Sequence, residues 1–123
     1  MAIARTVGQT PTANGASPVQ NVAVTLPQNV ATGNAMMAVG KSRNGGTTSF
    51  SDGLSNTWAK DVQNTTDTDN NTAIGSAKNI TAGGACTITF TTTASANRMG
   101  LTVMEYSGFT GGAVFDKSAS ATG

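Results

Sequence analysis

Alternation between apolar and polar residues is the feature of this sequence that most constrains its fold. The clearest case is a run in which apolar residues on one side alternate with threonines on the other, in the order Cys86, Thr87, Ile88, Thr89, Phe90 and Thr91. A period of two residues is typical of a β-strand with one buried face. Gly, Thr and Asn interrupt every window long enough to hold a helix. We therefore predict an all-β chain.

Further alternating segments are separated by turn signals, which recur about every 8–12 residues. We expect about eight short strands, at residues 22–26, 35–39, 50–51, 58–62, 74–78, 86–90, 99–106 and 114–115. Polar loops are expected at 63–71 and 92–98. The strand 35–39 is apolar on both faces, because Met36 and Met37 point to opposite sides. The pattern predicts a two-sheet antiparallel β-sandwich, of the jelly-roll or immunoglobulin-like type.

The length of the chain fits a single domain. Its 123 residues can bury a modest core without a metal or a disulfide scaffold. Gly, Pro, Thr and Asn are frequent in residues 8–18, so we expect residues 1–18 to form an N-terminal arm or edge strand and residues 19–123 to form the β-sandwich domain. The single cysteine, Cys86, cannot form an internal disulfide, and its alternation with apolar residues places it in the core.

Charged residues are scarce, at 11% of the chain, and Thr, Ser, Asn, Ala and Gly take their place on the surface. The seven basic residues are scattered and form no stripe that would neutralise a run of phosphates, so we expect no nucleic-acid partner. The chain has neither an apolar run of about eighteen residues nor a charged leader followed by an apolar segment, so we expect no membrane span and no secretion signal. A protein made in the cytoplasm with a surface of extracellular type indicates a virion component, provided that Met1 is native.

Few residues are available for catalysis. The chain has no histidine, which excludes Ser–His and Cys–His pairs and imidazole metal ligands. A glycoside hydrolase would need the single glutamate, Glu105, with a second carboxylate placed opposite it. The five aspartates fall in loop or edge segments, at positions 52, 61, 67, 69 and 116. We therefore expect no enzymatic activity and no cofactor.

Glu105 lies in an otherwise apolar strand, Leu101-Thr-Val-Met-Glu-Tyr-Ser-Gly108. An ionised carboxylate inside a core is too costly without partners. It must therefore accept hydrogen bonds, meet a cation or lie at the wet end of the strand. We favour an anchoring hydrogen bond to backbone amides of a neighbouring loop, and we keep Glu105 as a candidate ligand contact.

Two further groups are candidates for binding. Trp58 and Tyr106 are the aromatic residues that a sugar-binding platform would use, although a chain with so few aromatic rings needs them in its core. Asp67, Asp69 and Asn71 resemble the start of a calcium loop, because hard cations prefer several oxygen ligands from one flexible segment. The glycine and the distal glutamate of such a loop are missing, which favours a solvated loop without a metal.

Several strings occur in a particular order: Asp52-Gly-Leu-Ser-Asn-Thr-Trp58, Ala77-Lys-Asn-Ile-Thr-Ala-Gly-Gly84, Glu105-Tyr-Ser-Gly108 and Ser118-Ala-Ser-Ala-Thr-Gly123. As an ordered set over residues 20–123, they resemble a β-sandwich module that recurs in large bacterial surface and secreted proteins and in phage structural proteins. The resemblance implies adhesion, display or carbohydrate contact without catalysis. In the larger modules the last string continues into further strands, so the resemblance also implies a sheet edge that a neighbouring subunit would cover.

Two functions follow from these observations. The first is a non-enzymatic structural protein on a virion surface, such as a phage capsid decoration or coat-associated protein, which forms homo-oligomers or binds other capsid proteins. The alternative is an extracellular adhesion or carbohydrate-binding module of a larger bacterial surface protein, for which a glycan would be the partner.

Overall fold

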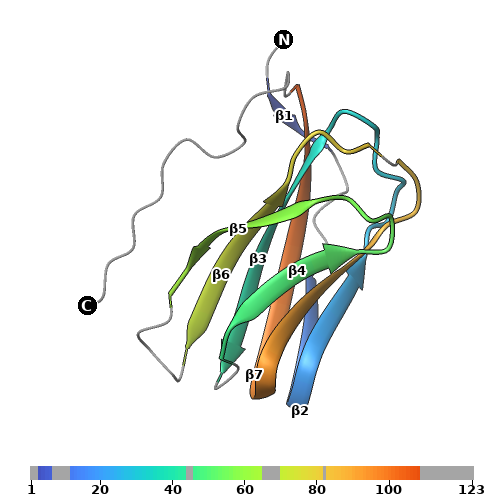
Figure 1. The fold of residues 1–123 in the computed structure, drawn as a ribbon. Helices are drawn as coiled ribbons and strands as arrows, with labels where there is room; N and C mark the ends of the chain where they lie inside the picture. The colour runs from blue at the N-terminus through green and yellow to red at the C-terminus, as the bar shows by residue number, and fades with distance from the viewer. Residues whose placement is uncertain (1–2, 7–11, 44–45, 65–69, 82, 109–123) are drawn as a thin grey trace.

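The computed structural model describes residues 3–6, 12–43, 46–64, 70–81 and 83–108. These residues form seven strands and no helix, and all strand pairs are antiparallel, which confirms the all-β prediction. The strands are β1 Ala4–Arg5, β2 Thr12–Thr25, β3 Ala35–Arg43, β4 Thr48–Asp52, β5 Trp58–Gln63, β6 Asn71–Ala77 and β7 Thr87–Ser107 (Figure 1).

All seven strands belong to one hydrogen-bonded sheet, with the order β1-β7-β3-β6-β5 and with β2 and β4 also paired to β7. The long strand β7 makes this possible, because its 21 residues serve two sets of neighbours. Its first part, residues 87–92, pairs with β2 and β4. Its second part, residues 98–107, pairs with β3, with β1 and with the beginning of β2. The expected two separate sheets are therefore one continuous sheet.

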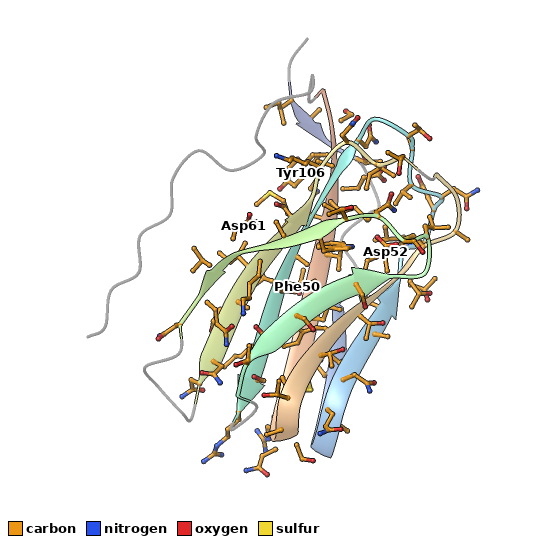
Figure 2. The ribbon with its side chains drawn as sticks, viewed as in Figure 1. Phe50, Asp52, Asp61 and Tyr106 are labelled. Atoms are coloured by element: carbon orange, nitrogen blue, oxygen red, sulfur yellow. The ribbon has the colours of Figure 1, made fainter. Side chains whose placement is uncertain are left out.

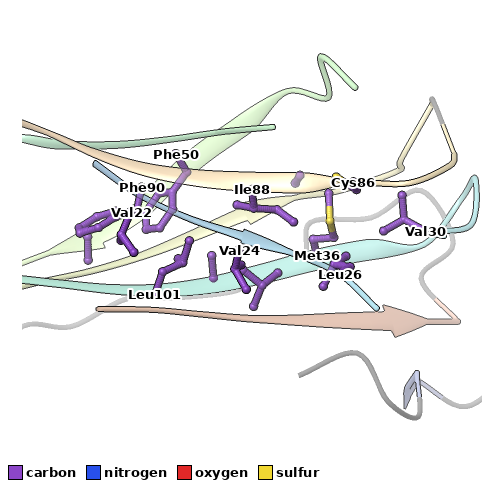
Figure 3. Close-up of a cluster of buried hydrophobic side chains, with 14 of the residues drawn as sticks. Val22, Val24, Leu26, Val30, Met36, Phe50, Cys86, Ile88, Phe90 and Leu101 are labelled. Carbon is purple, nitrogen blue, oxygen red and sulfur yellow. The ribbon is translucent and has the colours of Figure 1, made fainter. Parts of the chain in front are cut away.

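The two parts of this sheet nevertheless face each other across a core, as the layers of a sandwich do (Figure 3). Phe50 of β4 and Phe90 of β7 pack together with ring centroids 5.1 Å apart. The glycines of the opposite layer lie directly under these rings: an added Cβ would come within 2.5 Å of the Phe90 ring at Gly40 and within 2.4 Å of the Phe50 ring at Gly75. The aromatic rings of one layer thus fill the space above the glycines of the other.

The bend that brings the layers together was not visible in the sequence. Residues 92–98, expected to form a polar loop, continue β7 without interruption. The partner β2 has two register shifts opposite this stretch, between Ala16 and Val19 and between Val19 and Asn21. Irregularities of this kind bend a strand and increase its twist. The expected boundary after Pro18 falls within β2, and the expected strand at 114–115 lies outside the described residues.

The two layers differ in their outer faces. The layer of β4 with the adjoining parts of β2 and β7 carries a hydroxyl face, made of Thr25, Ser49, Ser51, Thr87, Thr89 and Thr91. The outer face of the layer of β5, β6, β3 and the second part of β7 carries six half-buried apolar side chains, which we call the apolar face, with Thr72, Ser76 and Thr102 among them. The six are Met37, Val39, Val62, Ile74, Met104 and Tyr106. The expectation of a strand that is apolar on both faces is confirmed for β3, where Met36 is buried in the core and Met37 lies on the apolar face.

Candidate functional site

Three loops meet at one end of the sandwich, which we call the loop end. They connect β2 to β3 (26–34), β4 to β5 (53–57) and β6 to β7 (78–86), and Figure 1 shows them together at the upper right. Two of the four strings that the sequence singled out, 52–58 and 77–84, run through these loops, and a third begins at Glu105, which accepts hydrogen bonds from the 26–34 loop. The loop end is therefore the candidate site.

Glu105 lies beneath the loop end with only 1% of its surface exposed. Its Oε1 atom accepts hydrogen bonds from the backbone N–H of Ala31 at 3.0 Å and from Nδ2 of Asn34 at 2.7 Å. Its backbone carbonyl accepts the N–H of Thr6 at 2.8 Å. Hydrogen bonds from oriented donors compensate a carboxylate for its lost hydration. The predicted anchoring bond to a neighbouring loop is confirmed, and Glu105 is not accessible to a ligand.

The loop that Glu105 anchors is tied in turn to the loop between β6 and β7. The carbonyl of Asn34 accepts the N–H of Ile80 at 2.9 Å, and the carbonyl of Ile80 accepts the N–H of Gly33 at 2.8 Å. Val30 and Gly84 exchange two backbone hydrogen bonds of 2.9 and 3.0 Å. The second string supplies the geometry for these contacts, because Ile80 is 1% exposed and Gly84 has a φ of 139°. The string is thus used to join two loops.

Asp52 organises the turn between β4 and β5 (Figure 2). Its Oδ1 accepts the backbone N–H groups of Leu54 at 2.8 Å and Asn56 at 3.1 Å, and its Oδ2 accepts the indole N–H of Trp58 at 2.8 Å. Oδ1 of Asn56 then accepts the backbone N–H of Thr81 at 3.2 Å, which joins this turn to the loop after β6. The spacing Asp-x-x-x-Asn-x-Trp therefore specifies the turn between β4 and β5 and the hydrogen bond that joins this turn to the loop between β6 and β7.

The two aromatic candidates do not come together. Trp58 lies on the inner side, partly exposed, and stacks on Phe50 with ring centroids 5.8 Å apart. Tyr106 lies on the apolar face of β7, opposite Ala35 of β3, and its hydroxyl donates to Sδ of Met104 at 3.5 Å. Because the two rings lie on opposite faces of the same layer, they do not form one platform.

The calcium candidates are only partly within the described residues. Asp67 and Asp69 lie outside them. Asn71 is 4% exposed, faces Ser42 across the β3–β6 pair and donates from Nδ2 to the carbonyl of Gly46 at 3.1 Å. Asn71 therefore points into the sandwich. Within the described ranges, no three His, Cys, Asp or Glu side chains gather closely enough to hold a metal ion.

Cys86 lies in the core with no exposed surface. Burial raises the pKa of its thiol from 9.0 to about 11, and the negative charges of Asp52 and Glu105 add to the increase. Thiolate is the nucleophilic form of cysteine. At neutral pH the thiol stays protonated, and Cys86 acts as a small core residue, as predicted.

Comparison with known proteins gives no relative. No protein-family model, curated protein or solved structure matches the chain. The resemblance to β-sandwich modules of surface and phage proteins therefore stays an expectation from the sequence strings. In the part of the chain that the structure describes, no helix is long and apolar enough to cross a membrane.

One border of the sheet is closed by side chains. Lys60 of β5 donates from Nζ to the backbone carbonyl of Thr48 in β4 at 3.1 Å and to Oε1 of Gln63 at 2.6 Å. Nε2 of Gln63 donates to the carbonyl of Gly46 at 3.2 Å. These side chains bridge the gap where the chain passes from one layer to the other. A lysine on an edge strand also discourages the addition of a further strand.

The opposite border, formed by β2, is different. Among the described strands β2 pairs only with β7, and Figure 1 shows it along the lower right border of the molecule. The backbone N–H of Leu26 donates to the backbone carbonyl of Cys86 at 3.0 Å. In an antiparallel pair every second residue points its N–H and C=O groups toward the partner, so Val24 and Val22 also point theirs toward β7. The residues between them point theirs outward, namely Asn21, Ala23 and Thr25, which are also exposed. We call residues 21–25 the open edge.

The open edge and the apolar face are the surfaces that residue-by-residue reasoning missed. Alternation shows which side of a strand is buried, but it does not show which strands lie beside it. For the apolar face a signal was present: Met37 follows a buried methionine, and Met104 and Tyr106 occupy the even positions of a strand whose odd positions are buried. For the open edge, the sequence strings implied that an edge would be left for a neighbouring subunit, but no residue pattern showed that this edge would be β2.

Proposed function

We propose that this chain is a non-enzymatic structural subunit of a virion surface, which acts through contacts with copies of itself or with other capsid proteins. The candidate side chains support this proposal by their positions: Glu105, Asp52 and Trp58 each hold part of the loop end and have their polar groups bound within the chain. Because these polar side chains are used to hold the chain's own loops, we infer that contacts with other molecules are made by the outer faces and the edges of the sheet.

The open edge is the observation that carries the proposal. It offers outward backbone N–H and C=O groups along a regular five-residue stretch, 21–25, on a strand without the charged side chains that usually protect an edge. An added strand would gain backbone hydrogen bonds there with little dependence on side-chain identity. The adjoining hydroxyl face is uncharged and suits a surface that stays in contact with water.

The test combines sedimentation at rising concentration with mass spectrometry of purified particles. We expect the chain to assemble as its concentration rises and to be present in particles. Ala23→Pro removes one outward amide and should shift assembly to at least several-fold higher concentration, whereas Ala23→Thr keeps the amide and should leave assembly unchanged. A chain that stays monomeric throughout and is absent from particles would contradict the proposal.

An extracellular adhesion or carbohydrate-binding module is the alternative, and it rests on the resemblance of the sequence strings. The geometry supports it less, because one face of the Trp58 ring is stacked on Phe50 and its indole N–H is bound to Asp52. A glycan array separates the two functions. Saturable sugar binding by a monomeric protein, lost in Trp58→Ala with the fold retained, would favour the alternative.

A further inference from the structure

A layer of polar side chains lies in the core at the end of the sandwich opposite the loop end, where β7 bends (Figure 1). Thr92 comes just before this bend and pairs with Thr48 of β4. Ser42 of β3 pairs with Met99, just after the bend, and with Asn71 of β6. We call Ser42, Thr48, Asn71 and Thr92 the polar layer, and each of these side chains is at most 4% exposed.

The side chains of the polar layer point inward, because alternate residues of a strand share a face. The two threonines lie two residues from Phe50 and Phe90, whose rings pack in the core. Ser42 and Asn71 lie on the same strand faces as the glycines beneath these rings. The polar layer is therefore the next layer of the core beyond the aromatic rings, and it places hydroxyl and amide groups where the core is otherwise apolar.

Three oxygen atoms of the polar layer have no hydrogen-bond partner among the described residues. They are Oγ of Ser42, Oγ1 of Thr48 and Oδ1 of Asn71, and all three are shielded from solvent. The hydroxyl of Thr92, by contrast, donates to the carbonyl of Ala94 at 2.7 Å. A buried polar atom without a partner destabilises a fold, so such atoms are nearly always paired in native proteins. We therefore expect the three oxygens to share a bound ligand.

The orientation of Asn71 brings these atoms together. Its Nδ2 donates to the carbonyl of Gly46 at 3.1 Å, and a carbonyl can only accept, so this bond fixes which end of the amide carries the oxygen. Gly46 lies two residues before Thr48, so the Asn71 side chain reaches from β6 to the start of β4. Ser42 lies directly opposite Asn71 in the β3–β6 pair. One acceptor and two hydroxyls from three strands thus meet inside the sandwich.

The chemistry of the three oxygens favours water over a cation. A water molecule can donate to Oδ1 of Asn71 and also bond to both hydroxyls, and a buried water typically makes about three hydrogen bonds. A hard cation prefers carboxylate ligands, and the polar layer holds none. In addition, the ammonium group of Lys60 donates to the backbone carbonyl of Thr48 at 3.1 Å, and a second positive charge beside it would be repelled.

We propose that the polar layer binds a buried water molecule, held by Oγ of Ser42, Oγ1 of Thr48 and Oδ1 of Asn71. This water joins β3 and β6 of one layer to β4 of the other. The site lies inside the sandwich, away from the open edge, and it does not depend on the function proposed above.

A high-resolution crystal structure of the full chain tests the site directly. We expect a water within about 2.7–3.2 Å of all three oxygens. Hydroxyls of Ser42 and Thr48 that bond to other groups of the chain, with no solvent density between them, would overturn the proposal. Density at about 2.3–2.6 Å from four or more oxygens would also overturn it and would identify a cation instead.

The stability of Thr48→Val supplies a second test, because its sign depends on whether the hydroxyl is paired. Valine keeps the shape of threonine without the hydroxyl. If the hydroxyl holds a water, its loss should raise the equilibrium constant of unfolding about five-fold in urea, and Ser42→Ala should act in the same direction. Thr89→Val, on the hydroxyl face, is the matched control and should stay within about two-fold of the unsubstituted protein.

An unpaired buried hydroxyl gives the opposite result, since valine then removes a group that destabilises the fold. An unfolding constant that is unchanged or lower in both Thr48→Val and Ser42→Ala would therefore overturn the proposal. If Thr48→Val does not fold, Ser42→Ala and the crystal structure of the unsubstituted chain decide the matter without it.

Discussion

Substituting alanine for Gly40 tests the close contact between the two layers. An added Cβ would lie 2.5 Å from two carbons of the Phe90 ring, about 1 Å nearer than an ordinary van der Waals contact. Phe90 has no exposed surface, so its ring cannot move outward to make room. Overpacking of this kind costs up to about 3 kcal/mol. The better strand conformation of alanine returns about 0.5–1 kcal/mol, which leaves a predicted net loss of about 2 kcal/mol in the free energy of unfolding.

The assay is urea unfolding followed by the fluorescence of the only tryptophan, Trp58, which stacks on Phe50 in the same core. Gly53→Ala is the matched control, because its added Cβ would have no neighbour nearer than 4.0 Å. It should change the free energy of unfolding by less than about 0.5 kcal/mol.

A double-mutant cycle shows whether the ring is the cause. If the clash with Phe90 is responsible, Phe90→Leu should relieve it, and the Gly40→Ala/Phe90→Leu protein should be more stable than the sum of the two single changes by about 1–2 kcal/mol. Gly40→Ala within about 0.5 kcal/mol of the unsubstituted protein, or strictly additive effects, would refute the reasoning that the rings of one layer require glycine in the other.

Three further predictions concern residues that hold the scaffold. Glu105→Ala leaves the donors of the 26–34 loop without their acceptor and should destabilise the fold by about 3 kcal/mol, whereas Glu105→Gln keeps an acceptor oxygen and should cost about 1 kcal/mol; equal stability of both variants in urea would contradict the anchoring role. Asp52→Ala removes the acceptor of three donors, so we expect a loss of about 2 kcal/mol and a red-shifted emission of Trp58, and unchanged emission would argue against the indole hydrogen bond. For Cys86, the pKa of the thiol is higher in the folded state, about 11 against 9.0, so its contribution to stability is fully present below pH 9 and is lost as the pH rises toward 11. The extra loss relative to Cys86→Ala over this pH range should be about 2–3 kcal/mol, and parallel pH profiles of the two proteins would rule it out.

Local pattern predicted the strand class and the inner faces well. Alternation identified the core side of the strand around Phe90 and the buried position of Cys86, because a period of two residues directly reports which side of a strand is dry. The cost of an isolated buried charge predicted that Glu105 would accept hydrogen bonds from a loop. Both inferences depend on the chemistry of single residues, which the sequence states directly.

The arrangement of neighbours could not be predicted in the same way. Residues 92–98 look like a loop because they are polar, yet backbone pairing with β2, distant in the sequence, keeps them within β7. Asp67, Asp69 and Asn71 resembled the start of a calcium loop, although the sequence favoured a solvated loop; the one that is described, Asn71, points inward. The separation of Trp58 from Tyr106 follows from the faces on which β5 and β7 present them, which aromatic content alone does not reveal.

By itself the sequence determined that this chain forms strands, which side of each strand is buried and that its one glutamate must be held by donors, since these follow from side-chain hydrophobicity, period and charge. Only the tertiary structure decided that β7 pairs with four strands and that β2 keeps an open edge. It also decided that the rings of Phe50 and Phe90 in one layer pack directly on glycines of the other layer. The physical reason is that strand pairing uses backbone N–H and C=O groups, which nearly every residue carries alike, so the choice of neighbour depends on the packing of the whole fold.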